Sequence, residues 1–557
     1  MKKRIFSIIL VLTMLFTLGS VGFAFKPDVE KKAVVPLMAD KDNDKIFDDL
    51  ALKLKDASDS DEFKVIAVFN ESYNLQGIKN AIGHFATSYE YININAFAAT
   101  LNKGQIIALS KMPQIKHIQL DAEVKATMYT ASSWFGVTKA RNDWGVTGDR
   151  DGSLSSYSKN DIVIAIIDTG IDTNHQDLDG GKVIAWKDFV NGNTTPYDDN
   201  GHGTHCASIA AGSGDANWNY RGVAYGAALI GLKVLDANGS GSMSNVDAAI
   251  DWCITNKDTY NIRVISMSLS TSSSSDGQDS TSLLVNQAYN NGIVVVVAAG
   301  NSGSGGYTIG SPSAAENAIT VGAMADVGEY GFFLADFSSR GYTADGRIKP
   351  DICAPGYNII AAAANTTSQY TTKSGTSMAT PFVAGTVALM LDANPNLTPA
   401  DVKTIIQNTA EDWGKAGKDI DYGWGRLQAY EAIKSAGGYS GTGPWVPYHA
   451  ADRDYLPGTG YYDTFKVYVS NTSYPIAVNL IMENATNYPD FDLYVYGPDG
   501  YRDAYDATYD RQEQVKFLPD QTGWYTIYVY SYSGSGYYYV DVSVNGSNFY
   551  QYANDSY

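Results

Sequence analysis

The segment Ser374–Pro381, with the sequence SGTSMATP, opens onto the apolar run Phe382–Leu391 and predicts the start of a buried helix. Proline is tolerated in the first turn of a helix, where backbone N–H groups have no intrahelical partner, so we expect the helix to begin near Thr376. Ser377 would then lie beside free N–H groups at the positive end of the helix dipole. That position suits a nucleophile whose reaction builds an oxyanion, although Gly-Thr-Ser is also an ordinary capping sequence. Partners elsewhere in the chain decide between the two interpretations.

Four apolar runs in the middle region, residues 130–437, indicate strands that are buried on both faces, as the central strands of a parallel sheet are. They cover residues 162–167, 229–235, 264–269 and 293–298. Helical patterns lie between them. This alternation predicts a doubly wound α/β domain, whose ligands gather at the carboxyl ends of the strands.

Candidate catalytic side chains follow those strands. Asp168 comes directly after the first strand, Asn301 comes shortly after the last, and His202 opens an apolar helical run. An aspartate in a turn is common, and His202 with His205 resembles a metal-binding pair. The zinc-protease helix, however, spaces its histidines by four residues and carries a Glu beside the first, which is absent here. One catalytic base and a second, structural histidine therefore fit the pattern better.

Taken together, these motifs resemble the subtilisin-like serine proteases, or subtilases, in residue type and in chain order. The resemblance implies that Ser377 is the nucleophile, His202 its general base and Asp168 the group that orients the imidazole. Asn301 and the Ser377 N–H would bind the oxyanion. An endopeptidase that needs no cofactor for catalysis follows from this assignment. The alternative is a catalytically silent secreted adhesion protein on the same fold, but such relatives usually lack one of these four groups.

The resemblance also implies a groove in which a protein or peptide substrate lies as an added strand. The matched positions on its two edges and its floor are Gly239, Ser240, Gly241, Ser268, Leu269, Ser270 and Gly310. None is charged, which implies an apolar preference for the residue before the scissile bond. Ser270 stands where the family usually has Gly. Segment 213–222 differs in length from the family's calcium loop at that place, so that calcium site is not carried over.

Residues 1–24 indicate an export signal, because basic residues are followed by the apolar run 5–18 and by small residues that end at Ala24. That run is too short to span a bilayer, and no other stretch is long and apolar enough. We therefore expect a secreted, extracellular protein without a membrane anchor. The net charge of −20 argues against nucleic acid as a partner, and we expect a monomer.

The three cysteines, Cys206, Cys253 and Cys353, are too few and odd in number to form a disulfide framework. We expect each to be a buried thiol that packs like a small hydrophobic side chain. Cys206 lies close to His202 in the sequence, but its apolar helical setting favours burial over a nucleophilic role.

Residues 25–129 indicate a small α+β unit in which strands and helices alternate. The predicted elements are strand 63–69, helix 78–82, strand 91–97, helix 105–112 and strand 115–120. In its position the unit resembles the family's inhibitory propeptide, which implies an intramolecular inhibitor and folding template removed by self-cleavage between residues 125 and 131. The acidic stretch 40–49 is spaced like a calcium loop but lacks the required Gly and Glu, so a solvated acidic segment is an equal alternative.

Residues 438–450 are rich in Gly and Ser and indicate a linker, beyond which lies a Tyr-rich unit, residues 451–557. Strand-like alternation appears at residues 463–469, 476–482, 491–496 and 524–530. The motifs DFDLYV and GWYTIYV resemble the prepeptidase carboxyl-terminal β-sandwich, an all-β, jelly-roll-like domain. We expect an independent domain, such that a chain ending near Gly438 still cleaves small peptides.

Three carboxylates of this last unit, Asp490, Asp492 and Asp499, are candidate ligands for a structural Ca²⁺. Aspartates that only stabilise turns explain the same residues equally well.

Overall fold

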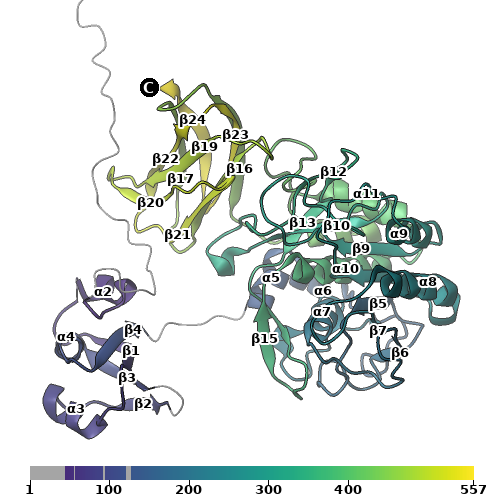
Figure 1. The fold of residues 1–557 in the computed structure, drawn as a ribbon, viewed down its shortest axis with the longest axis horizontal. Coiled ribbons are helices and arrows are strands. Elements are labelled where there is room, and N and C mark those ends of the chain that lie inside the picture. The colour runs from purple at the N-terminus through teal and green to yellow at the C-terminus, as the bar shows by residue number, and fades with distance from the viewer. Residues whose placement is uncertain (1–43, 56, 92–94, 121–126, 557) are drawn as a thin grey trace, which may run out of the picture.

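The computed structural model describes residues 44–55, 57–91, 95–120 and 127–556. The export signal predicted for residues 1–24 lies outside the described residues. Figure 1 shows three successive units, which are a small α+β unit, a large α/β unit and a β-sandwich. Among the described helices, none combines the length and the apolar character that crossing a bilayer requires.

The amino-terminal unit is a four-stranded antiparallel sheet with the strand order β2-β3-β1-β4. Its elements are α2 (Asp48–Lys55), β1 (Glu62–Phe69), α3 (Leu75–Ile82), β2 (Thr87–Glu90), β3 (Ala96–Asn102), α4 (Lys103–Ser110) and β4 (Ile115–Leu120). The strand predicted at residues 91–97 is confirmed only at its end, because Ala96 and Phe97 begin β3. Tyr91 follows β2 and its N–H donates to the Ala96 carbonyl at 3.0 Å, and residues 92–94 lie outside the described residues. The other predicted elements of this unit are confirmed.

The middle unit is organised by a seven-stranded sheet in the order β13-β10-β9-β8-β5-β7-β6, whose neighbouring strands all run parallel. The strands are β5 (Val163–Asp168), β6 (Val183–Asp188), β7 (Ala228–Lys233), β8 (Ile262–Met267), β9 (Val294–Ala298), β10 (Ile319–Met324) and β13 (Ile352–Pro355). Every residue of β5, β7 and β9 is buried. The predicted parallel α/β architecture is therefore confirmed.

Helices pack on this sheet (Figure 1), among them α10 (Thr376–Ala393), most of whose residues are buried. It begins at Thr376, as predicted, and carries Pro381 near its start. Its neighbours include α7 and strands β8, β9, β10 and β13. The remaining helices and short strands are α5 (Thr127–Trp134), α6 (Val137–Trp144), α7 (His202–Ala211), η1 (Trp218–Tyr220), α8 (Met243–Tyr260), α9 (Ser280–Asn290), η2 (Val327–Glu329), β11 (Gly341–Tyr342), β12 (Ile348–Lys349), β14 (Ile359–Ala362), β15 (Tyr370–Lys373), α11 (Pro399–Thr409) and α12 (Ala429–Gly437).

The carboxyl-terminal unit is a sandwich of a four-stranded sheet, β16-β23-β18-β21, and a five-stranded sheet, β20-β19-β22-β17-β24. The strands are β16 (Tyr448–Leu456), β17 (Tyr462–Val469), β18 (Ile476–Met482), β19 (Asp490–Tyr496), β20 (Arg502–Asp506), β21 (Gln512–Phe517), β22 (Gly523–Ser533), β23 (Gly536–Val544) and β24 (Gly546–Ser556). The four predicted strands are confirmed, and five others were missed. In β18 all residues are buried, so it does not have the solvent face that the predicted alternation requires.

The outer face of the four-stranded sheet of the sandwich packs on the α/β unit. Ile481 and Tyr539 belong to the same hydrophobic core as the helices of that unit. His449 stacks on Trp413 with ring centroids 3.8 Å apart. The interface therefore covers groups that a detached sandwich would leave in water.

A buried carboxylate lies at the centre of this interface. Asp421, from the α/β unit, is 1% exposed and binds Arg511 of the sandwich through two contacts of 2.6 and 2.9 Å. Arg340 adds a contact of 3.2 Å, and the Tyr539 hydroxyl donates to the same carboxylate. Burial by itself raises the pKa of Asp421, but Arg511 and Arg340 outweigh it and hold the pKa below its usual value.

Replacing Asp421 by Ala would leave two buried guanidinium groups without their anionic partner. We expect Asp421→Ala to lower the free energy of unfolding by about 3–5 kcal/mol. Asp258→Ala, which removes the same charge from a side chain that is 98% exposed, should change it by less than about 0.5 kcal/mol. Urea unfolding measures both. Equal effects of the two substitutions would contradict the structural role of Asp421.

Candidate active site

The shortest polar contact among the candidate catalytic residues joins Asp168 to His202. Asp168 ends β5 and is 1% exposed, whereas the His202 side chain, at the start of α7, is 24% exposed. The ring Nδ1 lies 2.7 Å from Asp168 Oδ1, which assigns the proton to Nδ1 and leaves Nε2 as the acceptor. Burial lowers the pKa of His202, but the Asp168 carboxylate outweighs it and raises the pKa well above its ordinary value. Asp168 thus fixes the tautomer of the neutral ring and stabilises the protonated ring.

The turn before His202 is held by Asp198, a residue that the sequence analysis missed. One of its carboxylate oxygens accepts hydrogen bonds from the Thr169 hydroxyl at 2.9 Å and from the Gly201 N–H at 2.8 Å. The other accepts from the N–H and the hydroxyl of Thr204, at 2.9 and 2.7 Å. Burial raises the pKa of Asp198, and these hydrogen bonds outweigh it and lower the pKa. The clue to Asp198 in the sequence was its position four residues before His202, at the end of a segment without helix or strand.

Ser377 is the second residue of α10 and is half-buried. Its hydroxyl donates to the Ser268 carbonyl at 3.2 Å rather than to the His202 ring. The Ser377 carbonyl accepts from the Ser268 hydroxyl at 2.8 Å and from the Cys206 thiol at 3.3 Å. The helix start is therefore fixed against the residue that follows β8.

Cys206 is buried, as predicted for all three cysteines. Burial raises the pKa of its thiol, so the group stays protonated and donates to a carbonyl.

Asn301 follows β9 and lies against the first residue of α10. Its side-chain oxygen accepts from the Thr376 N–H at 2.9 Å and from the Thr376 hydroxyl at 3.1 Å. Because Thr376 engages the oxygen, the amide NH₂ is the part of the side chain that is left to donate. Thr376 is a second residue that the sequence analysis did not single out. Its hydroxyl also contacts the Gly300 carbonyl at 3.2 Å.

His205, the second histidine of the pair, lies inside the protein. Its Nε2 is 3.1 Å from the Thr371 carbonyl, and burial lowers the pKa of the ring to about 3. A neutral ring bonded to a backbone carbonyl agrees with the structural interpretation of this residue.

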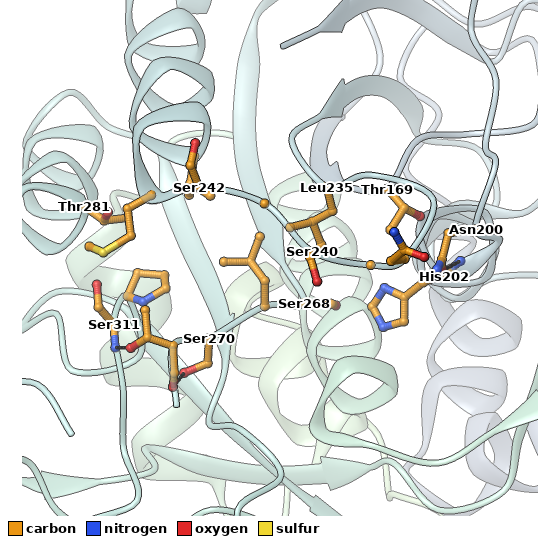
Figure 2. Close-up of a pocket in the computed structure, with 18 residues that line it drawn as sticks. Thr169, Asn200, His202, Leu235, Ser240, Ser242, Ser268, Ser270, Thr281 and Ser311 are labelled. Atoms are coloured by element: carbon orange, nitrogen blue, oxygen red, sulfur yellow. Dashed lines mark hydrogen bonds between the residues drawn. The ribbon is translucent and has the colours of Figure 1, made fainter. Parts of the chain in front are cut away.

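A groove of about 520 Å³ runs from His202 along the two predicted edges. Figure 2 shows His202 at one end and Ser311 at the other, with Ser240 and Ser268 between them. Six of the seven predicted groove residues line it, namely Gly239, Ser240, Gly241, Ser268, Leu269 and Ser270. Gly310 does not line it. A Cβ at Gly310 would lie 2.2 Å from the Thr271 carbonyl oxygen, so this glycine packs against that backbone and its neighbour Ser311 faces the groove.

The predicted calcium ligands of the sandwich do not converge. Asp499 lies in the turn between β19 and β20, where it accepts from the Tyr501 N–H at 3.0 Å. Asp492 is buried, accepts from the Tyr494 hydroxyl at 2.9 Å, and has a pKa raised to about 6, chiefly by burial. Among the described residues, Asp490, Asp492 and Asp499 do not form a cluster with metal-binding spacing. The turn interpretation fits Asp499.

A different carboxylate cluster is formed by Asp149, Asp151 and Asp161, whose oxygens lie within 4.8 Å of one another. Asp161 accepts from the N–H groups of Arg150 and Ser158, at 3.0 and 2.8 Å. Asp149 and Asp151 likewise accept from backbone N–H groups of the same loop. These hydrogen bonds account for the cluster, because all three carboxylates bind backbone N–H groups of the loop that carries them.

Three segments of the chain match models of known families. Residues 41–105 match the Tk-SP N-propeptide domain, residues 159–425 the subtilase family, and residues 461–531 the bacterial pre-peptidase C-terminal domain. Serine protease AprX of Bacillus subtilis is 40% identical over 348 residues, which cover 58% of this chain and 76% of AprX. The chain belongs to the subtilase family. The resemblance predicted from the motifs is thereby confirmed for all three units.

Further relatives of this subtilase are subtilisins. Subtilisin J of Geobacillus stearothermophilus is 32% identical over 442 residues, which cover 78% of this chain and 99% of that protein. The solved structure of sphericase shares 36% sequence identity with this chain and superposes with a TM-score of 0.42. The match covers 51% of this chain and 97% of the sphericase chain. Because it is a subtilase, the protein is a serine protease and therefore a peptide hydrolase. A propeptide domain precedes its protease domain in the chain.

Asp198 accepts five hydrogen bonds, the four described above and one from the Asn200 N–H at 3.1 Å. We therefore expect Asp198→Asn to lower the free energy of unfolding by about 1–3 kcal/mol at neutral pH, since its NH₂ would oppose an N–H donor. The folded-state pKa of Asp198 is lowered, so the carboxylate stabilises the fold above about pH 4 and this contribution is lost as the pH falls through that pKa. The deficit of the variant should therefore shrink in acid.

Urea unfolding at several pH values, in a Ser377→Ala background, measures this effect. Asp179→Asn, at an exposed position, is the matched control and should have little effect at any pH. A deficit of Asp198→Asn that is the same at pH 7 and in acid would contradict the contribution assigned to the charge.

Proposed function

We propose that this subtilase is a secreted serine endopeptidase in which Ser377 is the nucleophile and His202 its general base. Asp168 fixes the imidazole and stabilises its positive charge. Asn301 and the Ser377 N–H bind the oxyanion. The observation that carries the proposal is the 2.7 Å contact between Asp168 and His202 at one end of the groove. No cofactor takes part in this chemistry.

The proposed reaction begins when the Ser377 hydroxyl turns from the Ser268 carbonyl towards His202. As Oγ bonds to the substrate carbonyl carbon, its proton moves to His202 Nε2 and the carbonyl oxygen becomes an oxyanion. The carbon–nitrogen bond then breaks, and the leaving amine takes the proton from Nε2. A water molecule attacks the resulting ester by the same route in reverse, which frees the acid product and restores Ser377.

The groove supports an extended peptide as the substrate. Residues 239–241 and 268–270 face each other across it, and backbone groups of such edges pair with a peptide strand whatever its side chains. Apart from His202, the residues that line the groove are uncharged, which supports a broad specificity with an apolar preference before the scissile bond.

The propeptide domain supports synthesis as an inactive precursor. We infer that this domain inhibits the protease in the same chain until cleavage between residues 125 and 131 releases it. The predicted export signal, residues 1–24, supports secretion before or during this step. Cleavage of casein by the secreted protein distinguishes the protease from a catalytically silent protein on the same fold.

If Ser377 is the nucleophile, Ser377→Ala should abolish both casein cleavage and self-processing, because the neighbouring Thr376 hydroxyl is engaged by Gly300 and Asn301. Full-length precursor should accumulate, visible by gel and by mass spectrometry. Ser374→Ala, three residues earlier and exposed, serves as the control and should mature normally. Maturation and casein cleavage by purified Ser377→Ala would refute the assignment.

The proposed role of Asn301 predicts an effect on turnover rather than on affinity. Asn301→Leu should lower kcat by about 10²–10³, with KM changed less than about threefold, because the hydrogen bond strengthens only in the transition state. Ser302→Ala, at the next exposed position, should leave both constants near those of the parent. Steady-state kinetics on a soluble peptide anilide provide the test, and a raised KM at unchanged kcat would rule out the oxyanion role.

A further inference from the structure

The loop that carries Asn301, residues 301–308, has a sequence that allows its backbone unusually many conformations. Three of the five residues that follow Asn301, in the sequence SGSGG, are glycine. Glycine loses more conformational entropy on ordering than any other residue. A single position for Asn301 therefore requires anchors outside the loop.

The first anchors come from the α/β unit. The Ser302 N–H donates to the Ser339 hydroxyl at 3.0 Å, and the Gly303 N–H donates to the Phe337 carbonyl at 2.9 Å. They hold the beginning of the loop. The end of the loop is held where the Thr308 hydroxyl donates to the Arg340 carbonyl at 2.9 Å.

The middle of the loop is anchored by the carboxyl-terminal sandwich. Arg511 Nη1 donates to the Ser304 carbonyl at 2.8 Å, and the Gly306 N–H donates to the Ala485 carbonyl at 2.9 Å. The same Nη1 lies 2.6 Å from Asp421 Oδ1. Arg511 is fully buried, so one guanidinium group ties the loop to the central carboxylate of the interface.

Side-chain packing does not replace these anchors. A cavity of about 550 Å³ separates residues 301–304 from the sandwich and is lined on the far side by Asp506, Thr508, Asp510, Gln512 and Gln514. The loop therefore faces open space on one side. Its position depends on hydrogen bonds, which are directional, more than on dense packing.

We propose that Arg511 is a positioning residue for catalysis, which acts from the carboxyl-terminal sandwich by holding the loop that presents Asn301 to the oxyanion. This rests on the oxyanion role proposed above for Asn301. Small displacements of a preorganised donor reduce the stabilisation of the transition state and leave substrate binding unchanged. The sandwich is then part of the catalytic apparatus as well as a structural support.

Arg511→Lys tests the proposal, because lysine keeps the positive charge beside Asp421 but has no planar fork to reach the Ser304 carbonyl as well. We expect kcat to fall by about tenfold and KM to change less than about twofold on a soluble peptide anilide. His449→Ala is the matched control, since His449 lies in the same interface without contacting the loop. It should lower the melting temperature but leave kcat within about twofold, measured where circular dichroism shows both variants to be folded.

Two combined variants separate positioning from general destabilisation. In an Asn301→Leu background, Arg511→Lys should no longer lower kcat, because the donor it positions is absent. Gly305→Ala should restore part of kcat in the Arg511→Lys enzyme by restricting the loop. Gly305 does not have a positive φ, and a Cβ there would meet no atom within 4 Å.

An equal loss of kcat from Arg511→Lys with and without Asn301 would overturn the proposal, and so would a loss that Gly305→Ala does not relieve. If Arg511→Lys does not fold, Arg511→Gln is used in the same series, and failure of both to fold assigns Arg511 to stability alone. A normal kcat in the single variant Asn301→Leu would instead overturn the oxyanion role itself. The two failures are therefore distinguishable.

Discussion

The first two residues of α10 bond to the ends of two parallel strands, and the site depends on this contact. Thr376 donates to the Asn301 side chain after β9, while Ser377 exchanges hydrogen bonds with Ser268 after β8. The helix is buried along most of its length, so its start cannot shift without disturbing the core. A nucleophile at this position is held in place by the sheet. This supplies the preorganisation that oxyanion stabilisation requires.

The parts of the fold that could be predicted from the sequence are those with a local physical signature. Strands β5 and β9 are buried on both faces, so their runs contain no polar alternation. The start of α10 was predictable because Pro381 restricts where the helix can begin. The strand expected at residues 91–97 began too early, because Tyr91 bonds back to Ala96 at the point where β3 begins. Gly310 was assigned to the groove because of the family resemblance. Its packing against Thr271 depends on tertiary structure, which the local sequence does not reveal.

Long-range pairing explains most of what the sequence analysis missed. Asp421 lies 81 residues from Arg340 and 90 residues from Arg511, and no periodicity connects such distant positions. Strand β18 did contain a clue, because Ile476–Met482 is apolar at six of seven positions. An antiparallel strand with that composition needs cover on both faces, and the second cover is the α/β unit. The Gly/Ser linker suggested independence, but linker composition says nothing about how its ends dock.

The order in which the interface residues occur along the chain has a consequence for biosynthesis. Asp421 and Arg340 leave the ribosome before Arg511 and Tyr539 exist, so the α/β unit first emerges with a core carboxylate that lacks two of its partners. Domains generally fold in turn from the amino terminus, yet here the last-made domain supplies those two partners to the one before it. A buried carboxylate of the α/β unit therefore acquires its full set of hydrogen bonds only near the end of synthesis.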